Sequence, residues 1–264
     1  MTVFEEEGFL ADDFDFFQKE LEDACGEPLS ICLDLSRHAQ RFQYSLRIHS
    51  GNLPEVISAA LFARVLSTFQ ASVLLAQRGM RFQVEMLIRC ILEAVFPLVA
   101  VSKSPEFANT YVLAEEHERL KAIKRVARCK KRLGENSGLH VAGNLEAEVE
   151  KDIRDRKIRH LSTYDCADKA GMADYYDTLY CYTSMSLHAS PRSLQEALDL
   201  DPAGVKVTAL KNEPDSSRLG ACLVTLGDCL AKSVSAMSLI FDVAEPPSIT
   251  DLSARLDEHA SRLI

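Results

Sequence analysis

The sequence has no tryptophan and little glycine or proline, with 11 glycines and 9 prolines among 264 residues. A fold made of many short strands needs glycine and proline at its turns and aromatic residues in its sheets, so this shortage disfavours a β-rich architecture. Alanine, leucine, glutamate, lysine and arginine are abundant instead, and these residues are strong helix formers. Because 47% of the residues are hydrophobic and 26% are charged, we expect a globular all-α protein.

The sequence also lacks targeting and membrane signals. It opens with Met-Thr-Val-Phe-Glu-Glu-Glu, whereas a secretory leader begins with Lys or Arg. The most apolar stretch, from Val84 to Val101, is interrupted by Glu85, Arg89 and Glu93. Each of these charges would cost about 3 kcal/mol at the centre of a bilayer. We therefore expect a cytoplasmic protein with no membrane partner.

Motifs for metals and cofactors are missing as well. The eight cysteines include no Cys-x-x-Cys pair, and none stands near a histidine at the spacing of a zinc site. Phosphate-binding glycine loops, nucleophile elbows, His-Glu-x-x-His motifs and dinucleotide fingerprints are absent. The run Glu115-Glu-His-Glu118 is interpreted as the solvated part of a helix. We expect neither a metal nor a cofactor.

The periodicity of apolar residues predicts the main elements. The predicted helices span residues 29–48, 54–79, 80–101, 105–133, 145–161, 173–188, 217–243 and 250–263, and a loop with a short β-like run lies at 199–217. Asn52 and Ser104 are expected N-caps, since each precedes a proline in the first turn of a predicted helix. We expect residues 1–50 to form a helical arm packed on the body. Residues 51–264 should form one bundle of six to eight helices around the helix at 80–101, which is apolar on nearly every side.

This central helix carries one polar seam, made of Arg81, Glu85, Arg89 and Glu93. The four residues are four apart, so their side chains stack on one face and pair by charge. One interpretation is structural, with an ion ladder that fixes the register of a buried helix. The other is catalytic. Arg89 holds a phosphate or carboxylate, Glu93 accepts a proton and His188, at the end of the 173–188 helix, completes the site. His188 fits a helix C-terminal cap equally well.

Three segments resemble an uncharacterised bacterial group, domain-of-unknown-function family 5677. They are Arg78-Gly-Met-Arg81, Arg89-Cys-Ile-Leu-Glu93-Ala and Ser186-Leu-His188-Ala-Ser-Pro191, and the similarity runs from about Leu53 to Leu198. That group is similar to HEPN-type helical domains. Many of these are metal-independent ribonucleases of toxin-antitoxin and phage-defence systems, while others only bind nucleotides or partners. The resemblance implies a HEPN-like bundle that acts on or binds RNA.

The resemblance also implies a homodimer, which the apolar stripe of the 217–243 helix favours, although this stripe can equally pack within the chain. It points to a second catalytic pair, because the HEPN ribonuclease signature is an arginine followed four to six residues later by a histidine. Arg154 and His160 match this spacing, with Asp155 in place of the usual asparagine. In such an enzyme the 2′-hydroxyl of the RNA attacks, the histidine moves protons and the arginine stabilises the phosphorane.

A basic segment is hidden by the net charge of −9. Residues 119–160 carry 13 Lys or Arg against 6 Asp or Glu. Two basic helices there are expected to form one phosphate-binding face, for which the candidates are Arg125, Arg128, Lys130, Lys131, Arg132, Arg156 and Lys157. The alternative is that these charges belong to ordinary solvated helix faces.

A second class of function therefore stays open, a non-catalytic adaptor or ligand-sensing bundle. In that case the polar seam is structural, and the acidic N-terminus docks a protein partner with its rings of Phe4, Phe9, Phe14, Phe16 and Phe17. The two classes differ in where His188 lies relative to Arg89 and Glu93.

Overall fold

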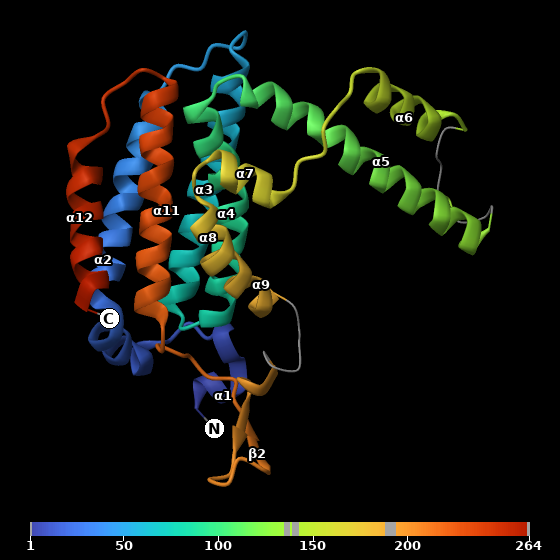
Figure 1. Ribbon diagram of the computed structural model, residues 1–264. Helices are drawn as coiled ribbons and strands as arrows, with labels where there is room; N and C mark the ends of the chain where they lie inside the picture. The colour runs from blue at the N-terminus through green and yellow to red at the C-terminus, as the bar shows by residue number, and fades with distance from the viewer. Residues whose placement is uncertain (1, 135–137, 139–142, 188–193, 263–264) are drawn as a thin grey trace.

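The computed structural model describes residues 2–134, 138, 143–187 and 194–262. Its body is a bundle of long helices that run side by side (Figure 1). These are α2 (Asp15–Ser45), α3 (Leu53–Gln77), α4 (Arg81–Lys103), α11 (Leu219–Ile240) and α12 (Pro247–Arg262). The sheet found among the described residues is one antiparallel hairpin of β1 (Leu198–Leu200) and β2 (Val207–Leu210). The predicted all-α fold is confirmed.

Helix α4 lies inside this architecture. Helices α3 and α11 pack against it, and so do α7 (Thr163–Lys169) and α9 (Cys181–Leu187), which are joined through α8 (Ala173–Tyr175) and the π-helical turn η3 (Tyr176–Tyr180). Most of its side chains between Val84 and Val101 are buried, whereas Arg89 is half-buried and Glu93 is exposed. A helix that is apolar on all sides belongs in a core. The predicted central position of this helix is therefore confirmed.

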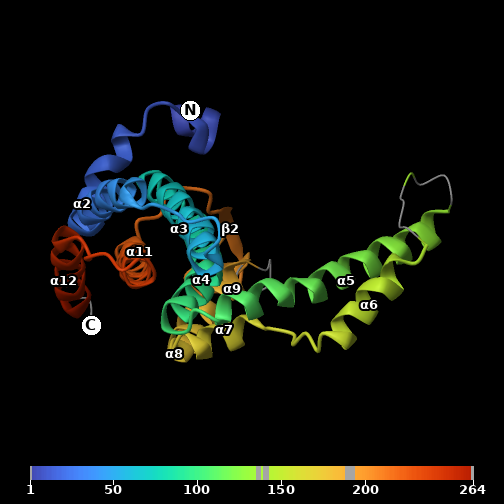
Figure 2. The same cartoon turned by 90° about the horizontal axis from the view of Figure 1, so that it is seen from above.

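Helices α5 (Phe107–Leu133) and α6 (Leu145–Asp155) project from the bundle as a two-helix arm, seen from above in Figure 2. The first part of α5 packs on α3 and α4, and α6 packs alongside α5. An ion pair of 2.6 Å between Lys124 and Glu150 links the two helices of the arm. The basic helices thus lie outside the bundle, as the sequence predicts.

Several helix ends differ from the predicted ones. Helix α2 begins at Asp15, and the expected break before residue 29 is a kink at Cys25, whose φ is −154° and ψ is 23°. Pro28 lies in the next turn and has no N–H to donate into the helix. Helix α5 begins at Phe107, because Ser104 donates its hydroxyl to Glu106 instead of capping. Helix α6 ends at Asp155, well before residue 161, since Lys157 has a left-handed φ of 52°.

The apolar stripe of α11 packs within the chain. Leu219, Leu223, Leu226 and Leu230 are all buried, and α11 contacts α2, α3, α4 and α12. This stripe therefore supplies no surface for a homodimer, which stays a prediction. By length and composition alone α3 and α11 would also pass as membrane spans, but core helices pass the same test, so this is weak evidence.

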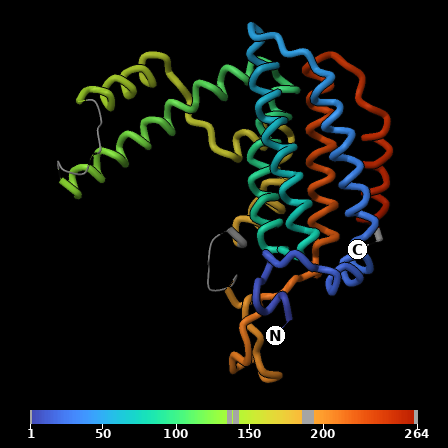
Figure 3. The backbone as a smooth tube through the Cα atoms, turned by 180° about the vertical axis from the view of Figure 1, so that it is seen from behind, coloured from blue at the N-terminus to red at the C-terminus, as the bar shows by residue number. Residues whose placement is uncertain are grey.

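The N-terminal segment and the hairpin lie at the same end of the bundle (Figure 3). The segment consists of α1 (Val3–Glu7) and the 3-10 turn η1 (Gly8–Leu10). The predicted boundary at residue 50 falls in the connection between α2 and α3, and α2 packs against α3, α11 and α12. The chain thus brings its N-terminus next to the residues that precede α11.

The close packing of α11 generates a first prediction, at Gly227. A Cβ added there would overlap Cδ1 of Leu256 and lie 3.2 Å from Cδ1 of Leu35. Both leucines are buried, so Gly227→Ala should lower the free energy of unfolding by about 1–3 kcal/mol in urea denaturation. The matched control is Gly220→Ala in the same helix, where the nearest atom is 3.6 Å away. It should be neutral or stabilise by up to about 1 kcal/mol, and equal effects would contradict the account.

Candidate functional site

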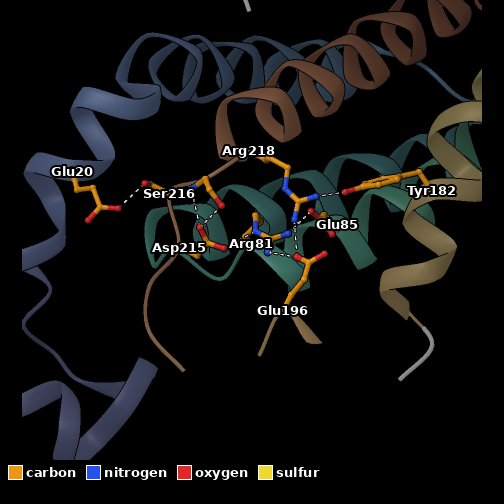
Figure 4. A network of polar contacts seen from close by, with 9 residues as sticks. Glu20, Arg81, Glu85, Tyr182, Glu196, Asp215, Ser216 and Arg218 are labelled. Atoms are coloured by element: carbon orange, nitrogen blue, oxygen red, sulfur yellow. Dashed lines mark hydrogen bonds and ion pairs between the residues drawn. The ribbon is translucent and has the colours of Figure 1, made fainter. Parts of the chain in front are cut away.

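Arg81 joins three segments at one end of α4 (Figure 4). Its three guanidinium nitrogens donate to carboxylates of Glu85, Glu196 and Asp215, each over 2.7 Å. Glu196 precedes β1 and Asp215 precedes α11, so the contacts link the hairpin region and the start of α11 to α4. The Arg81 side chain is only 4% exposed. A charge this deeply buried would be costly without its partners.

The predicted ladder is therefore two separate pairs with different surroundings. The Arg81–Glu85 pair is buried, whereas Arg89 and Glu93 form a 3.3 Å pair in which Glu93 is 42% exposed. Tyr180 lies over this second pair. Its hydroxyl accepts from Arg89 and donates to Glu93, both over 2.9 Å. Burial raises the pKa of Tyr180, so the hydroxyl keeps the proton that it donates.

Of the first predicted catalytic set, the structure describes Arg89 and Glu93. Arg89 is 21% exposed and its guanidinium is already engaged by Tyr180 and Glu93, so a phosphate would have to displace them. His188 lies outside the described residues. Glu93 also borders a pocket of about 430 Å³ whose lining includes Glu115 and Glu118. Glu93 pairs with Arg89, and Glu118 pairs with Lys121 over 2.5 Å. The pocket lining itself contains no Lys, Arg or His that could hold a phosphate.

The second predicted set leads to a cluster at the base of the arm. His160 Nε2 lies 3.3 Å from Lys121 Nζ and 3.9 Å from a carboxylate oxygen of Glu118. Its ring meets the ring of His117 edge to face, with centroids 5.5 Å apart. His117 in turn contacts the Ile158 carbonyl through Nε2, at 2.9 Å. The chain leaving α6 thus returns to α5 and delivers His160 to it.

Arg154 does not share this cluster in the contacts that the structure gives. It is exposed on α6 and makes no hydrogen bond or ion pair with the residues described here. His160 instead has Lys121 as its cationic neighbour. The signal that sequence reasoning missed is the helical spacing of a set of basic residues that are four, four, three and four positions apart, namely His117, Lys121, Arg125, Arg128 and Arg132. At 100° per residue these five side chains lie within about 80° of arc on α5.

The predicted phosphate-binding residues all lie on or beside the arm. Of these, Arg125, Arg128, Lys131, Arg132 and Lys157 are exposed and have no ion pair with a described residue, and the same holds for the half-buried Lys130. Arg156 differs, since it pairs with Asp152 over 2.7 Å. Free cations on a projecting element are open to an anionic ligand, whereas a paired one must first give up its carboxylate. As for metals, no group of three His, Cys, Asp or Glu close enough to hold an ion occurs in the described parts of the chain.

Comparison with known proteins identifies a family, but the description of that family names no activity. The model of a family described as "Family of unknown function (DUF5677)" matches residues 55–205. The matched part runs from the start of α3 through the arm to the hairpin and includes Arg81, Arg89 and His160. No curated protein and no solved structure gives a significant match. The HEPN-like arrangement therefore stays a prediction.

The burial of Arg81 generates the next prediction. Arg81→Met should lower the free energy of unfolding by about 3–5 kcal/mol, because it leaves the buried Glu85 carboxylate without its cation. Urea denaturation at neutral pH measures this loss. The control is Arg37→Met, which removes a pair whose side chains are 64% and 42% exposed. That change should cost less than about 1 kcal/mol.

The stability lost in Arg81→Met, relative to the unaltered protein, should depend on pH, and this dependence provides a check. Burial raises the pKa of Asp215, but hydrogen bonds from Ser217 and Arg81 outweigh it and leave the pKa below its usual range. The pKa of Glu196 is likewise lowered overall, since Arg81 and Arg218 outweigh its burial. The stabilisation is thus complete above the ordinary carboxyl pKa of about 4 and is lost as pH falls through the lowered values. If the difference in unfolding free energy between the unaltered protein and Arg81→Met grew on acidification, this explanation would be refuted.

Proposed function

The chain belongs to the DUF5677 family, and since the description of that family assigns no activity, we propose from the geometry that the protein binds RNA through its arm. The observation that carries this proposal is the α5 stripe from His117 to Arg132. Its cations are exposed on an element that projects from an otherwise acidic body. Such a surface attracts the phosphate backbone by releasing condensed counterions.

We further propose that the RNA is cleaved at the base of this stripe. There the imidazole of His160 accepts the proton of a ribose 2′-hydroxyl, whose oxygen bonds to the adjacent phosphorus. The bond from phosphorus to the 5′-oxygen breaks, and the Lys121 ammonium gives the leaving oxygen its proton. The products are a 2′,3′-cyclic phosphate and a 5′-hydroxyl end. The 3.3 Å contact between His160 and Lys121 supports this pairing. After the reaction His160 returns its proton to Lys121 across the same contact.

This chemistry needs no metal, in keeping with the resemblance to HEPN-type ribonucleases, and it suits an effector in phage defence or a toxin-antitoxin system. The charge that builds up on the phosphorane is met by Arg125, which follows Lys121 by one helical turn. Arg154, the arginine of the sequence signature, serves substrate binding on α6 in this proposal. Binding and cleavage therefore use one continuous surface of the arm.

The binding step is tested with Arg125→Ala/Arg128→Ala/Arg132→Ala. We expect affinity for a fluorescent oligouridine, measured by anisotropy, to fall at least about tenfold at low salt, because three phosphate contacts are lost. The slope of log K against log salt should decrease by about two, at roughly 0.7 per contact to a single strand.

The charge-matched control is Arg41→Ala/Lys211→Ala/Arg255→Ala, which removes three exposed cations outside the arm. Its affinity and salt slope should equal those of the unaltered protein. If both triple variants weaken binding equally, the interaction is a response to net charge and the arm is not the binding surface.

The cleavage step is tested with His160→Ala. The rate of cleavage of a single-stranded RNA in the presence of a chelator should fall by about 100-fold or more, which is a typical contribution of general acid-base catalysis. The thermal melt should stay unchanged, because His160 is an exposed residue. RNA affinity should also stay unchanged, because the cations of the arm supply the binding.

Two further histidine variants serve as controls. His38→Ala, on α2, should cleave at the normal rate. Loss of cleavage in His188→Ala but not in His160→Ala would move the reaction to the Arg89 and Glu93 set. A need for added metal, or no cleavage of any RNA tested, would leave the protein as an RNA-binding protein without this activity.

A further inference from the structure

A pocket of about 480 Å³ is lined by segments that lie at the end of the bundle opposite the α2–α3 connection, as the course of the backbone in Figure 3 shows. Its walls come from three segments, the N-terminal residues, the start of α2 and the chain before α11. The apolar part is formed by Val3, Phe4, Phe16, Phe17 and Pro214. Phe16 is 60% exposed and Val3 is 51% exposed, so a sizeable apolar surface faces outward. A contiguous apolar surface that is left exposed often marks a binding site.

The aromatic wall of the pocket is held in place from behind. The ring of Phe4 lies 5.2 Å from that of Phe9 and 5.8 Å from that of Phe16, centroid to centroid. Arg78, at the end of α3, lies 4.5 Å over the Phe14 ring and donates to the Ala11 carbonyl over 2.5 Å. The exposed rings are therefore part of a fixed cluster attached to the bundle.

The opposite wall is fixed by the backbone. Gly79 has a φ of +68°, and a Cβ there would lie 2.6 Å from Cβ of Pro214. The Asp215 N–H donates to the Gly79 carbonyl over 2.9 Å, and Asp215 also binds Arg81. Pro214 is thereby pressed onto the turn between α3 and α4. A pocket whose two walls are both anchored is preformed, which lowers the entropic cost of binding.

Carboxylates surround this apolar surface. Glu5, Asp13, Glu20 and Glu213 line the pocket, and the lining contains no Lys, Arg or His. In the sequence, residues 1–27 carry ten Asp or Glu and a single Lys. The pocket thus combines apolar rings with a negative rim and has the opposite charge to the arm. Phosphate and acidic segments are repelled from it, and cationic ones are attracted.

We propose that this pocket docks a cationic amphipathic segment of a partner protein. A large apolar side chain of the segment lies against Phe16 and Pro214, and flanking Lys or Arg residues pair with the rim. A volume of about 480 Å³ accommodates one or two such apolar anchors. The rim sets the orientation and the on-rate, while the buried anchor supplies most of the affinity.

The test uses a synthetic helix-forming peptide with leucines on one face and lysines on the other, labelled for fluorescence anisotropy. A scrambled peptide of the same composition, in which the leucines share no face, should bind at least tenfold more weakly. In the protein, Phe16→Ser and Glu213→Lys should each lower affinity for the first peptide at least tenfold. Glu213→Lys leaves the aromatic cluster intact, so a folding defect in Phe16→Ser would not obscure the result.

The control variants make the same changes elsewhere, Leu239→Ser on α11 and Asp251→Lys on α12, both at exposed positions. They should bind the peptide normally. Equal binding of the scrambled peptide, or equal losses in the controls, would overturn the proposal. So would a concentration-dependent dimer in sedimentation that Phe16→Ser abolishes, since a second copy would then cover the pocket. RNA affinity should be normal in Phe16→Ser, so this test is independent of the arm.

Discussion

The contact between one buried guanidinium and three carboxylates joins α4, the hairpin region and the start of α11. Arg81 sits in the first turn of α4, and its partners Glu196 and Asp215 lie 115 and 134 residues further along the chain. Arg218 supports the same arrangement by donating to Glu196 over 2.7 Å. Because an unpaired charge in this position would be expensive, the hairpin region and the start of α11 are bound to α4 together. The anchored wall of the N-terminal pocket depends on the same contact through Asp215.

Much of the bundle is predictable from local patterns. The apolar residues of α4 on nearly every side required a central position, and Asn52 caps α3 as its place before Pro54 indicates, accepting from the Glu55 N–H. Helix ends were less predictable where a competing contact decided them. Ser104 has the sequence context of a cap, yet its hydroxyl donates to Glu106. Periodicity also does not anticipate the left-handed Lys157 that ends the α6 region.

The candidate site was less predictable, because its contacts join distant parts of the chain. The spacing of the seam correctly paired Arg81 with Glu85 and Arg89 with Glu93, but it contained nothing about Asp215, Glu196 or Tyr180. His160 was singled out for its distance from Arg154, whereas its neighbours in space are His117 and Lys121. These three meet only because the chain turns back after α6. The basic composition of the arm, in contrast, is a property of the sequence alone.

The chain keeps its opposite charges on separate elements. Cations are concentrated on the arm formed by α5 and α6, and acids on the N-terminal pocket, so each surface repels the ligand proposed for the other. The central claim is that RNA lies along the arm. Photo-cross-linking to an RNA that contains 4-thiouridine, followed by mass spectrometry of the linked peptides, tests it most directly. The account predicts linked peptides from residues 117–132 and 145–160, and links confined to α2, α12 or the N-terminal segment would contradict it.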